Sequence, residues 1–414
     1  MTHKPLDVIH VRLTIKTSVA ALLLLLTVVS PSCGRQVSDL LGSDLEIKLT
    51  LDREYRERKL KDLSRDGRWL LFYHAENPMG LARFPRDGKP KLIQEVTGQS
   101  LQVVEMSTGK EAARIEERLS FFPARFLPGT HQILYAVVEK GMSQHQLWDF
   151  TSGQVRPCPA PHFDTPLVVD AETVYGTVRQ ISGDVAGDLL MSLSVKDCRL
   201  ETISLVDPKN ARNKLYPNSF TVSPDRRFLA YTAYKKAVVW DIGPKKIAAE
   251  ISPPAALDFA DDASYTPDGK LLIVAARSEK GEDRPNDESY YKQYLLVYET
   301  NGYKLVRRIE SPSEFWTRYR LAVAPDSRLL AVGYWTEENK FLQSYQEAHI
   351  VLYDITTGRE VGRALHSRVK AKRTNPFAAM LSRLMFTPDG KYLLSSTADT
   401  RVWKIESQAG SATR

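Results

Sequence analysis

The stretch Thr387-Pro388-Asp389-Gly390, followed by the apolar residues 392–395, recurs along the chain and sets its architecture. In such a stretch Pro presets the first central position, Asp hydrogen-bonds its own backbone and Gly completes a type I turn. The earlier copies are Ser64-Arg65-Asp66-Gly67, Leu127-Pro128-Gly129, Ser223-Pro224-Asp225, Thr266-Pro267-Asp268-Gly269 and Ala324-Pro325-Asp326-Ser327. Each is followed by an apolar run typical of a buried strand, at 69–73, 133–138, 228–232, 271–275 and 329–333.

A second motif, an aromatic residue, an acidic residue and then a glycine turn, completes each copy. Its clear examples are Trp148-Asp149, Trp240-Asp241, Tyr298-Glu299 and Tyr353-Asp354. Residues 106–109 form a weaker copy, and Trp403-Lys404 ends the series. Each repeat therefore holds two hairpins, or four antiparallel strands. A unit of this kind, repeated along a chain, is typical of a β-propeller blade.

Over residues 45–405 these motifs resemble those of the WD-repeat and YVTN-type bacterial β-propellers. The resemblance implies an all-β propeller, and we count seven blades at residues 59–117, 119–160, 162–208, 215–252, 256–311, 315–366 and 377–405. Six or eight blades stay open, because the third copy has Val169-Asp170-Ala171-Glu172 in place of the turn and the first contains two candidate outer hairpins. No Gly-His dipeptide occurs, so the buried Asp–His network of WD repeats is not expected.

The segment around Leu45, Ile47, Leu49 and Leu51 alternates apolar and polar residues, the period of a half-buried strand. It has no blade of its own, while the seventh blade has only three strands. We therefore predict that this N-terminal strand completes the last blade and removes its open edge. The propeller domain is expected over residues 45–406, followed by a disordered polar tail at 407–414.

Residues 1–32 have the form of a secretory signal: basic residues, then a short apolar run at 19–29, then small residues. Cys33 follows Ser30-Pro31-Ser32, which is similar to a bacterial lipoprotein box except that Ser30 stands where Leu is usual. We expect an exported, periplasmic or envelope protein, either lipidated at Cys33 or simply secreted, with residues 33–44 as a linker. The membrane is a partner only through such an anchor.

The net charge of the chain bears on its partners, and the positions of its cysteines bear on whether it contains a disulfide. Residues 1–32 carry three Lys or Arg and one Asp, which leaves a formal net charge of +5 on the rest of the chain. That excess is too small and too dispersed for a nucleic-acid surface. Export would permit a disulfide between Cys158 and Cys198. Their expected positions, at the end of an outer strand and in a turn at the opposite face, argue instead for two unpaired thiols.

The candidate site comes from loop lengths. Connections inside the first and last hairpins of a blade lie on one face, and the other connections lie on the opposite face. Long insertions fall in the second set only, at 74–100, 278–292, 336–346 and 367–379, in the neighbouring blades one, five, six and seven. Long loops on a rigid scaffold carry function. The binding residues that we predict on this sector are Tyr290, Tyr291, Trp316, Tyr319, Lys372, Arg373 and Phe377.

No sequence motif predicts catalysis. The chain has no G-x-S-x-G, H-E-x-x-H, Walker loop or paired C-x-x-C, and its histidines lack metal-ligand spacing. We therefore expect no catalytic residues, no metal and no cofactor. The leading hypothesis is a monomeric, non-catalytic module that binds a protein or a cell-surface polymer. The alternative is a propeller enzyme of the lactonase or quinoprotein/amine-dehydrogenase type, which carboxylates or histidines converging on the axis would favour, whereas an aliphatic axis would favour the binder.

Overall fold

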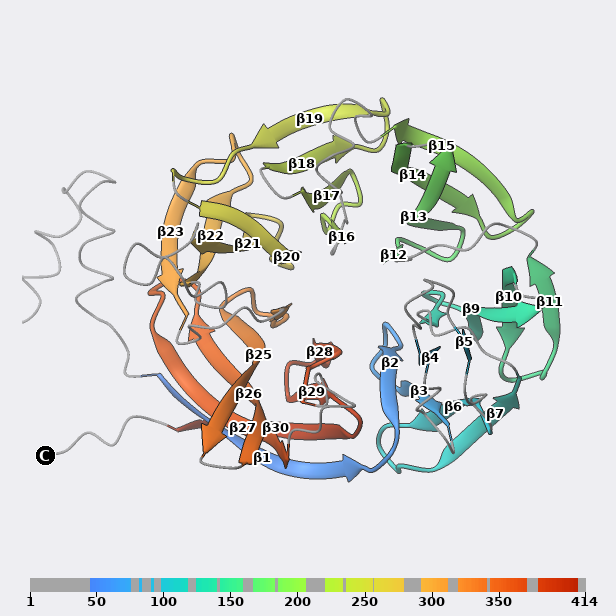
Figure 1. Ribbon diagram of the computed structural model, residues 1–414, viewed down its shortest axis with the longest axis horizontal. Helices are drawn as coiled ribbons and strands as arrows, with labels where there is room; N and C mark the ends of the chain where they lie inside the picture. The colour runs from blue at the N-terminus through green and yellow to red at the C-terminus, as the bar shows by residue number, and fades with distance from the viewer. Residues whose placement is uncertain are drawn as a thin grey trace, which may run out of the picture. The chain divides into compact units, whose positions relative to one another are not determined.

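The repeated turns bring the strands together in consecutive groups of four. The computed structural model describes residues 45–75, 82–83, 91–92, 98–117, 124–139, 142–158, 167–182, 185–205, 220–233, 236–255, 257–278, 292–311, 319–340, 343–370 and 379–408. These residues form seven four-stranded antiparallel sheets arranged around one axis (Figure 1). The predicted all-β, seven-bladed propeller is confirmed. In the part of the chain that is described, no helix has the length and apolar character needed to cross a membrane.

The first three blades are built as follows, from the innermost to the outermost strand. Blade one contains β2 (Lys59–Leu63), β3 (Trp69–His74), β6 (Ser100–Glu105) and β7 (Glu111–Glu116). Blade two contains β8 (Arg125–Phe126), β9 (Gln132–Glu139), β10 (Met142–Asp149) and β11 (Val155–Cys158). Blade three contains β12 (Leu167–Val168), β13 (Thr173–Ser182), β14 (Val185–Ser194) and β15 (Arg199–Leu205). A separate two-stranded ladder joins β4 (Ala82–Arg83) to β5 (Lys91–Leu92).

The remaining blades follow the same order. Blade four contains β16 (Phe220–Val222), β17 (Phe228–Ala233), β18 (Lys236–Asp241) and β19 (Lys246–Ile251). Blade five contains β20 (Leu257–Tyr265), β21 (Leu271–Ser278), β22 (Gln293–Glu299) and β23 (Leu305–Glu310). Blade six contains β24 (Arg320–Val323), β25 (Leu329–Lys340), β26 (Gln343–Asp354) and β27 (Glu360–Lys370). Blade seven contains β28 (Arg383–Phe386), β29 (Tyr392–Ser396), β30 (Thr400–Gln408) and β1 (Glu46–Tyr55).

The core lies between neighbouring blades, because each central strand buries both of its faces. Between blades five and six, for example, Ile273 and Leu295 pack with Leu330 and Val351, and all four are at most 1% exposed. The near-continuous apolar runs of the central strands supply these residues. Burial of this kind, at about 25 cal/mol per Å² of apolar surface, is the main stabilisation of the ring.

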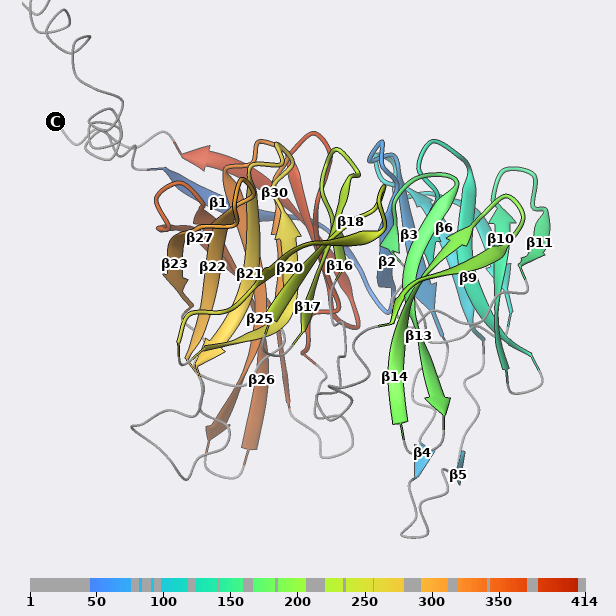
Figure 2. The same ribbon diagram turned by 90° about the horizontal axis from the view of Figure 1, so that it is seen from above.

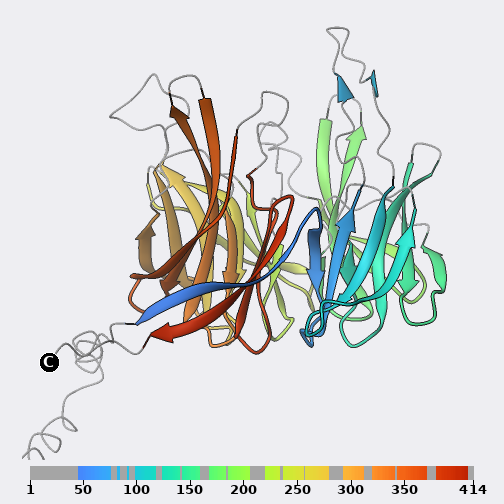
Figure 3. The ribbon, with the colours of Figure 1, turned by 90° about the horizontal axis from the view of Figure 1, so that it is seen from below.

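The ring is closed by the N-terminal strand. β1 pairs antiparallel with β30, from Glu46 opposite Gln408 to Tyr55 opposite Thr400, along the outer side of blade seven (Figure 3). The predicted closure is thus confirmed. β1 also approaches blade six so closely that a methyl group at Gly362 would lie 2.3 Å from the Ile47 carbonyl oxygen. β30 extends to Gln408, two residues into the predicted tail, because β1 offers partners that far.

Cys158 and Cys198 form a disulfide between blades two and three, with Cα atoms 5.3 Å apart. The prediction of two unpaired thiols was therefore wrong. β11 is only four residues long, and Cys158 pairs with His145 on β10. The strand is too short to carry Cys158 to the opposite face, so the residue remains within reach of Cys198 in the β14–β15 turn.

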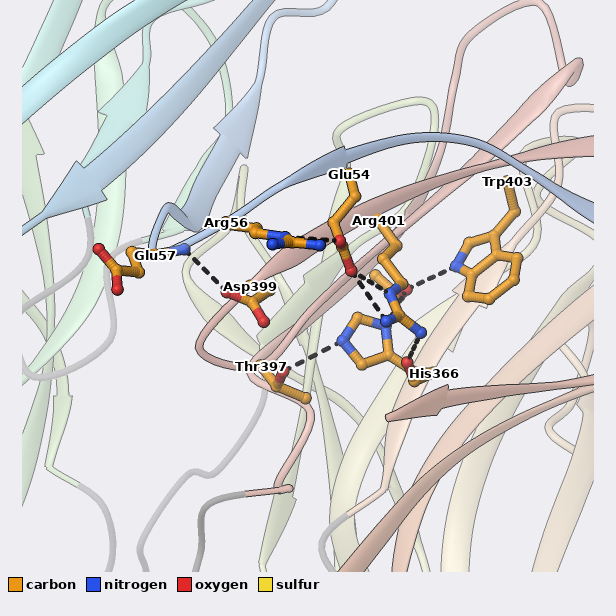
Figure 4. Close-up of polar contacts among 9 residues, drawn as sticks. Glu54, Arg56, Glu57, His366, Thr397, Asp399, Arg401 and Trp403 are labelled. Atoms are coloured by element: carbon orange, nitrogen blue, oxygen red, sulfur yellow. Dashed lines mark hydrogen bonds and ion pairs between the residues drawn. The ribbon is translucent and has the colours of Figure 1, made fainter. Parts of the chain in front are cut away.

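A buried histidine joins blade six to blade seven (Figure 4). His366 Nδ1 lies 2.7 Å from Ser395 Oγ, and its Nε2 lies 3.1 Å from Thr397 Oγ1. Trp403 Nε1 donates to the same Ser395 oxygen at 2.7 Å, and Arg401 donates to the His366 carbonyl. Ser395 accepts from Trp403 and still has its own proton to donate, so a neutral imidazole that accepts at Nδ1 and donates from Nε2 to Thr397 is compatible with these contacts. The missing Gly-His dipeptide gave no reason to expect such a network.

Closure of the ring can be tested with two residues of β1. Ile47 is 6% exposed and Leu51 is 46% exposed. We expect Ile47→Ala to lower the free energy of unfolding by about 2–4 kcal/mol, because it leaves a cavity between β1 and the adjacent blades. Leu51→Ala, the matched control on the same strand, should cost less than about 1 kcal/mol. Equal losses in chemical denaturation would show that β1 does not pack as described.

His366 should make stability depend on pH. Its burial, followed by the charge of Arg401, lowers the pKa of His366 to about 3. The unfolded chain therefore takes up a proton first as the pH falls below about 6.5. Stability from this residue should be complete near pH 7 and fall by about 2 kcal/mol at pH 5. In denaturation at both pH values, His366→Gln should lose this part of the difference. His131→Gln, a change at an exposed histidine, should retain it.

Candidate functional site

The predicted binding sector lies on the face that carries the long connections, which we call the insertion face; the opposite face, with the tight turns, is the turn face. Of the predicted binding residues, Tyr319 alone belongs to the described residues. The others, Trp316, Tyr290, Tyr291, Lys372, Arg373 and Phe377, lie outside them, as does the proposed lipidation residue Cys33. These assignments remain predictions.

Tyr319 immediately precedes β24 and is fully buried between blades five and six. Its ring centroid lies 6.4 Å from that of Tyr334 in an edge-on arrangement. The side chain thus packs between blades and offers no surface to a partner, so we leave it out of the binding surface developed below.

The insertion of blade six is a β-structure rather than the predicted loop. β25 and β26 have 12 residues each and pair as far as Lys340 opposite Gln343, and β27 continues beside them to Lys370. Figure 2 shows these strands extending past the neighbouring blades. We call residues 335–340, 343–349 and 366–370 the blade-six extension.

A second long hairpin was not predicted. β13 and β14 of blade three have 10 residues each and also project on this face (Figure 2). Blade three is not a neighbour of blades five, six, seven and one, so the expectation that long insertions fall in one sector only was wrong. The degenerate turn of this repeat hid the length of its central strands.

One side of the blade-six extension carries a connected set of polar and aromatic side chains. Thr336 Oγ1 lies 3.1 Å from His349 Nε2, and Glu347 lies 3.2 Å from the same ring nitrogen. Arg368 pairs with Glu347 at 3.3 Å and covers the ring of Tyr345 at 4.8 Å. Burial lowers the pKa of His349, against the opposing effect of Glu347. These contacts fix the orientation of Tyr345 and Arg368 at the end of the sheet.

The innermost strands hold a second group of polar residues that the sequence analysis did not identify. We call it the axial cluster, and it consists of Lys59, Lys61, Asp62, Arg125, Asp262, Arg320 and Arg383. The cluster thus contains five cations and two carboxylates on β2, β8, β20, β24 and β28, the innermost strands of five blades. Figure 1 shows β2, β20 and β28 beside the axis. An axis that is neither acidic nor aliphatic matches neither of the two alternatives weighed from the sequence.

Hydrogen bonds from these side chains link the innermost strands of neighbouring blades. Arginines donate to backbone carbonyls: Arg125 Nη1 to Lys61 at 2.7 Å, Arg383 Nε to Lys61 at 3.1 Å, and Arg320 Nε to Ser382 at 3.3 Å. Oxygen atoms accept from backbone N–H groups: Asp62 from Phe126 at 2.9 Å, Asp262 from Leu321 at 2.9 Å, and Thr221 from Tyr265 at 3.3 Å. The inner strands are therefore joined by side-chain-to-backbone bonds as well as by apolar packing.

The surroundings of the axial cluster disfavour its charged forms. Burial, followed by the charges of Lys59, Arg383 and Arg125, lowers the pKa of Lys61 to about 7. Burial also lowers the pKa of Arg125 and of Arg383, and raises that of Asp62. Desolvated like charges are costly, and groups with displaced pKa values concentrate at functional sites. The axial cluster is therefore a candidate site on physical grounds.

Among the described residues, hollows on the turn face include one at the axis and one between blades four and five. A cavity of about 360 Å³ at the mouth of the axis is lined by Asp62, Arg65, Arg125, Arg226 and apolar residues of blades one to four. A groove of about 720 Å³ lies between blades four and five, beside Phe228, Tyr265 and Tyr303. The groove's carboxylates, Asp225 and Asp268, each bind the hydroxyl of their own turn. Within the described ranges, no group of three or more His, Cys, Asp or Glu side chains is arranged to hold a metal ion.

The cations of the axial cluster had a signal in the sequence. Each lies within five residues before the first turn of its blade, on the strand nearest the axis. Arg320, for instance, immediately precedes the apolar residues 321–323. A single basic residue at a strand end is ordinary, and only the circular arrangement of seven blades makes such residues from different blades converge.

Comparison with known proteins supports the fold and no more. No family model matches the chain, and no curated protein matches it. Among solved structures, the chain is similar to the β-propeller domain of Cps50 (Swd1) from Myceliophteria thermophila, with a TM-score of 0.53 and 10% sequence identity. The match covers 87% of this chain and 100% of that one. At this identity the likeness establishes the β-propeller architecture alone.

Proposed function

We propose that this protein is a non-catalytic binding module that recognises a protein partner through its insertion face. A propeller supports interaction roles in general, because a rigid ring holds its connections at fixed positions. The observation that carries the proposal is the blade-six extension, where strands continue well past the ring and end in oriented polar and aromatic groups.

The side chains of the blade-six extension suit a protein interface. Tyr and Arg are enriched among residues that dominate binding energy, since each offers a large area and a polar end. Arg368 is ordered by both Tyr345 and Glu347, so little side-chain freedom remains to be lost on binding. The predicted residues Tyr290, Tyr291, Lys372, Arg373, Phe377 and Trp316 would extend this surface.

The enzyme alternative receives less support from the axis. A lactonase-type metal needs carboxylates and neutral ligands at the centre, whereas the axial cluster is dominated by Arg and Lys. Five cations repel a divalent metal and attract anions instead. A cell-surface polymer remains the other candidate for the insertion face, and binding to such a polymer is an outcome of the test below.

We further propose that the protein acts outside the cytoplasm, anchored through Cys33. The signal-like segment and the residues around Cys33 motivate this location. The disulfide between Cys158 and Cys198 supports it, because disulfides persist in exported proteins and are rare in the reducing cytosol. One acyl chain holds a protein only weakly at a membrane, so a full lipoprotein modification is implied.

Binding can be tested with two arginines of the same blade. Arg368 belongs to the blade-six extension, and Arg359 is exposed in the β26–β27 turn on the opposite face. We expect Arg368→Glu to reduce recovery of a protein partner from envelope extract at least tenfold, because it reverses the charge beside Tyr345. Arg359→Glu should leave recovery unchanged.

Both variants should unfold at the wild-type temperature, which separates lost binding from lost folding. Photo-crosslinking from position 337, exposed at the end of β25, should label the same partner. Equal recovery with both variants, or recovery of polysaccharide without protein, would contradict a protein-binding insertion face.

Lipidation of Cys33 can be tested directly by labelling. Cells that express the chain and are fed labelled palmitate should yield a labelled protein, and Cys33→Ser should abolish the label while the protein is still exported. Cys198→Ser is the matched control, because that cysteine lies in the propeller and should keep the label. Labelling that persists in Cys33→Ser would rule out this anchor.

A further inference from the structure

The axial cluster holds more positive charge than its structural role explains. Its carboxylates are engaged with backbone N–H groups: Asp62 with Phe126, and Asp262 with Leu321. At the junction of blades four and five, Thr221 makes the equivalent bond to Tyr265 with an uncharged hydroxyl. Linking of the inner strands therefore does not require ionised side chains, and the surplus of cations in blades six, seven, one and two needs another explanation.

The arginines of the cluster keep much of their donor capacity. A guanidinium has five N–H donors. Arg125 uses Nη1 and Arg383 uses Nε, and both bind the same Lys61 carbonyl oxygen. The charge of Asp62 favours the charged form of both arginines, and none of the hydrogen bonds that they donate goes to its carboxylate. Two guanidinium groups that converge on one carbonyl and retain donors form a ready set of partners for an oxyanion.

Two members of the cluster, Asp62 and Arg125, line the turn-face cavity of about 360 Å³. Arg65 and Arg226 also line this cavity. Arg226 lies 4.0 Å from Asp170, while Arg65 is exposed in the first turn of blade one. A basic mouth that leads to a basic interior attracts anions and discourages cations.

We infer that the axial cluster is a binding site for an oxyanion group, such as the phosphate or sulfate of a small molecule that enters the axis from the turn face. Arg125 and Arg383 would bind the oxygens, and Lys61 would supply a further positive charge. Arg65 would add positive charge at the entrance of the cavity. This site is separate from the blade-six extension and does not depend on the proposed protein partner.

The state of Lys61 couples such binding to pH. Its ammonium group lies 4.9 Å from the centre of the Tyr73 ring. The charged groups that act on it from the surrounding strands are Lys59 on β2, Arg125 on β8 and Arg383 on β28, and Asp62 is the next residue along β2. With a pKa of about 7, Lys61 is mostly charged at pH 6 and mostly neutral at pH 8. A bound anion favours the charged form, so binding should tighten as the pH falls.

Sulfate is the probe of choice, because its own charge is constant over this range. We expect sulfate to bind the purified full-length chain in titration calorimetry, and to raise its unfolding temperature more than chloride does at equal ionic strength. Affinity should be up to about tenfold higher at pH 6 than at pH 8, the change in the charged fraction of a group with a pKa near 7. Glycerol phosphate, tested beside sulfate, distinguishes an organic phosphate from a free anion as the preferred ligand.

Two variants and one control decide the assignment. Lys61→Met should remove the pH dependence and bind at pH 6 as weakly as the wild type at pH 8. Arg65→Gln, a change at an exposed turn residue, should weaken binding without affecting folding. Lys110→Met alters an exposed lysine in the β6–β7 turn and should bind like the wild type. Sulfate effects no larger than those of chloride, or equal affinities in all three variants, would overturn the inference.

Discussion

The pairing of β1 with β30 is the contact on which the rest of the ring depends. In a propeller each blade is stabilised by the two beside it, so one open junction exposes apolar faces on both neighbours. Blade seven takes its outer strand from residue 46 onward and its other three from the end of the chain. Gly362 lets that strand lie directly against blade six, and His366, Ser395 and Trp403 join the two blades from inside. Closure is therefore both a strand pairing and a packing arrangement.

The axis is governed by a different constraint. Innermost strands are short, so backbone groups near the centre need partners that strand pairing alone does not provide, and Asp62, Asp262 and Thr221 supply acceptors across blade junctions. The arginines donate hydrogen bonds to backbone carbonyl groups of a neighbouring blade. These bonds explain why polar residues lie here. They do not explain why five of the seven members are cations, since burial and neighbouring positive charges lower the pKa values of Lys61 and Arg383.

Local chemistry allowed the blades, their order and the closing strand to be predicted, because turns such as Thr387-Pro388-Asp389-Gly390 and the apolar runs after them carry their own structural meaning. The candidate sites were harder to predict from the sequence. An insertion such as residues 336–346 has the same polar composition whether it forms a loop or a continued hairpin. The disulfide was misjudged because it depends on where β11 ends. The axial cluster was missed because it depends on five distant strands, β2, β8, β20, β24 and β28, meeting at one centre.

Blade six takes part in both candidate sites, through Arg320 at the axis and Arg368 on the extension. The two sites differ in their cost to the stability of the fold. An extended hairpin projects from the ring, and its length hardly affects the packing between blades. Closely spaced, partly buried like charges at the centre reduce stability in every molecule, and they persist only where the surrounding packing is strong enough to hold them. The turns, strands and core of this chain all favour the same fold. A local feature that instead destabilises the fold is typical of a functional site. For this reason the charged axis carries a stronger physical argument for a ligand than the larger groove between blades four and five, whose carboxylates bind hydroxyl groups of their own turns.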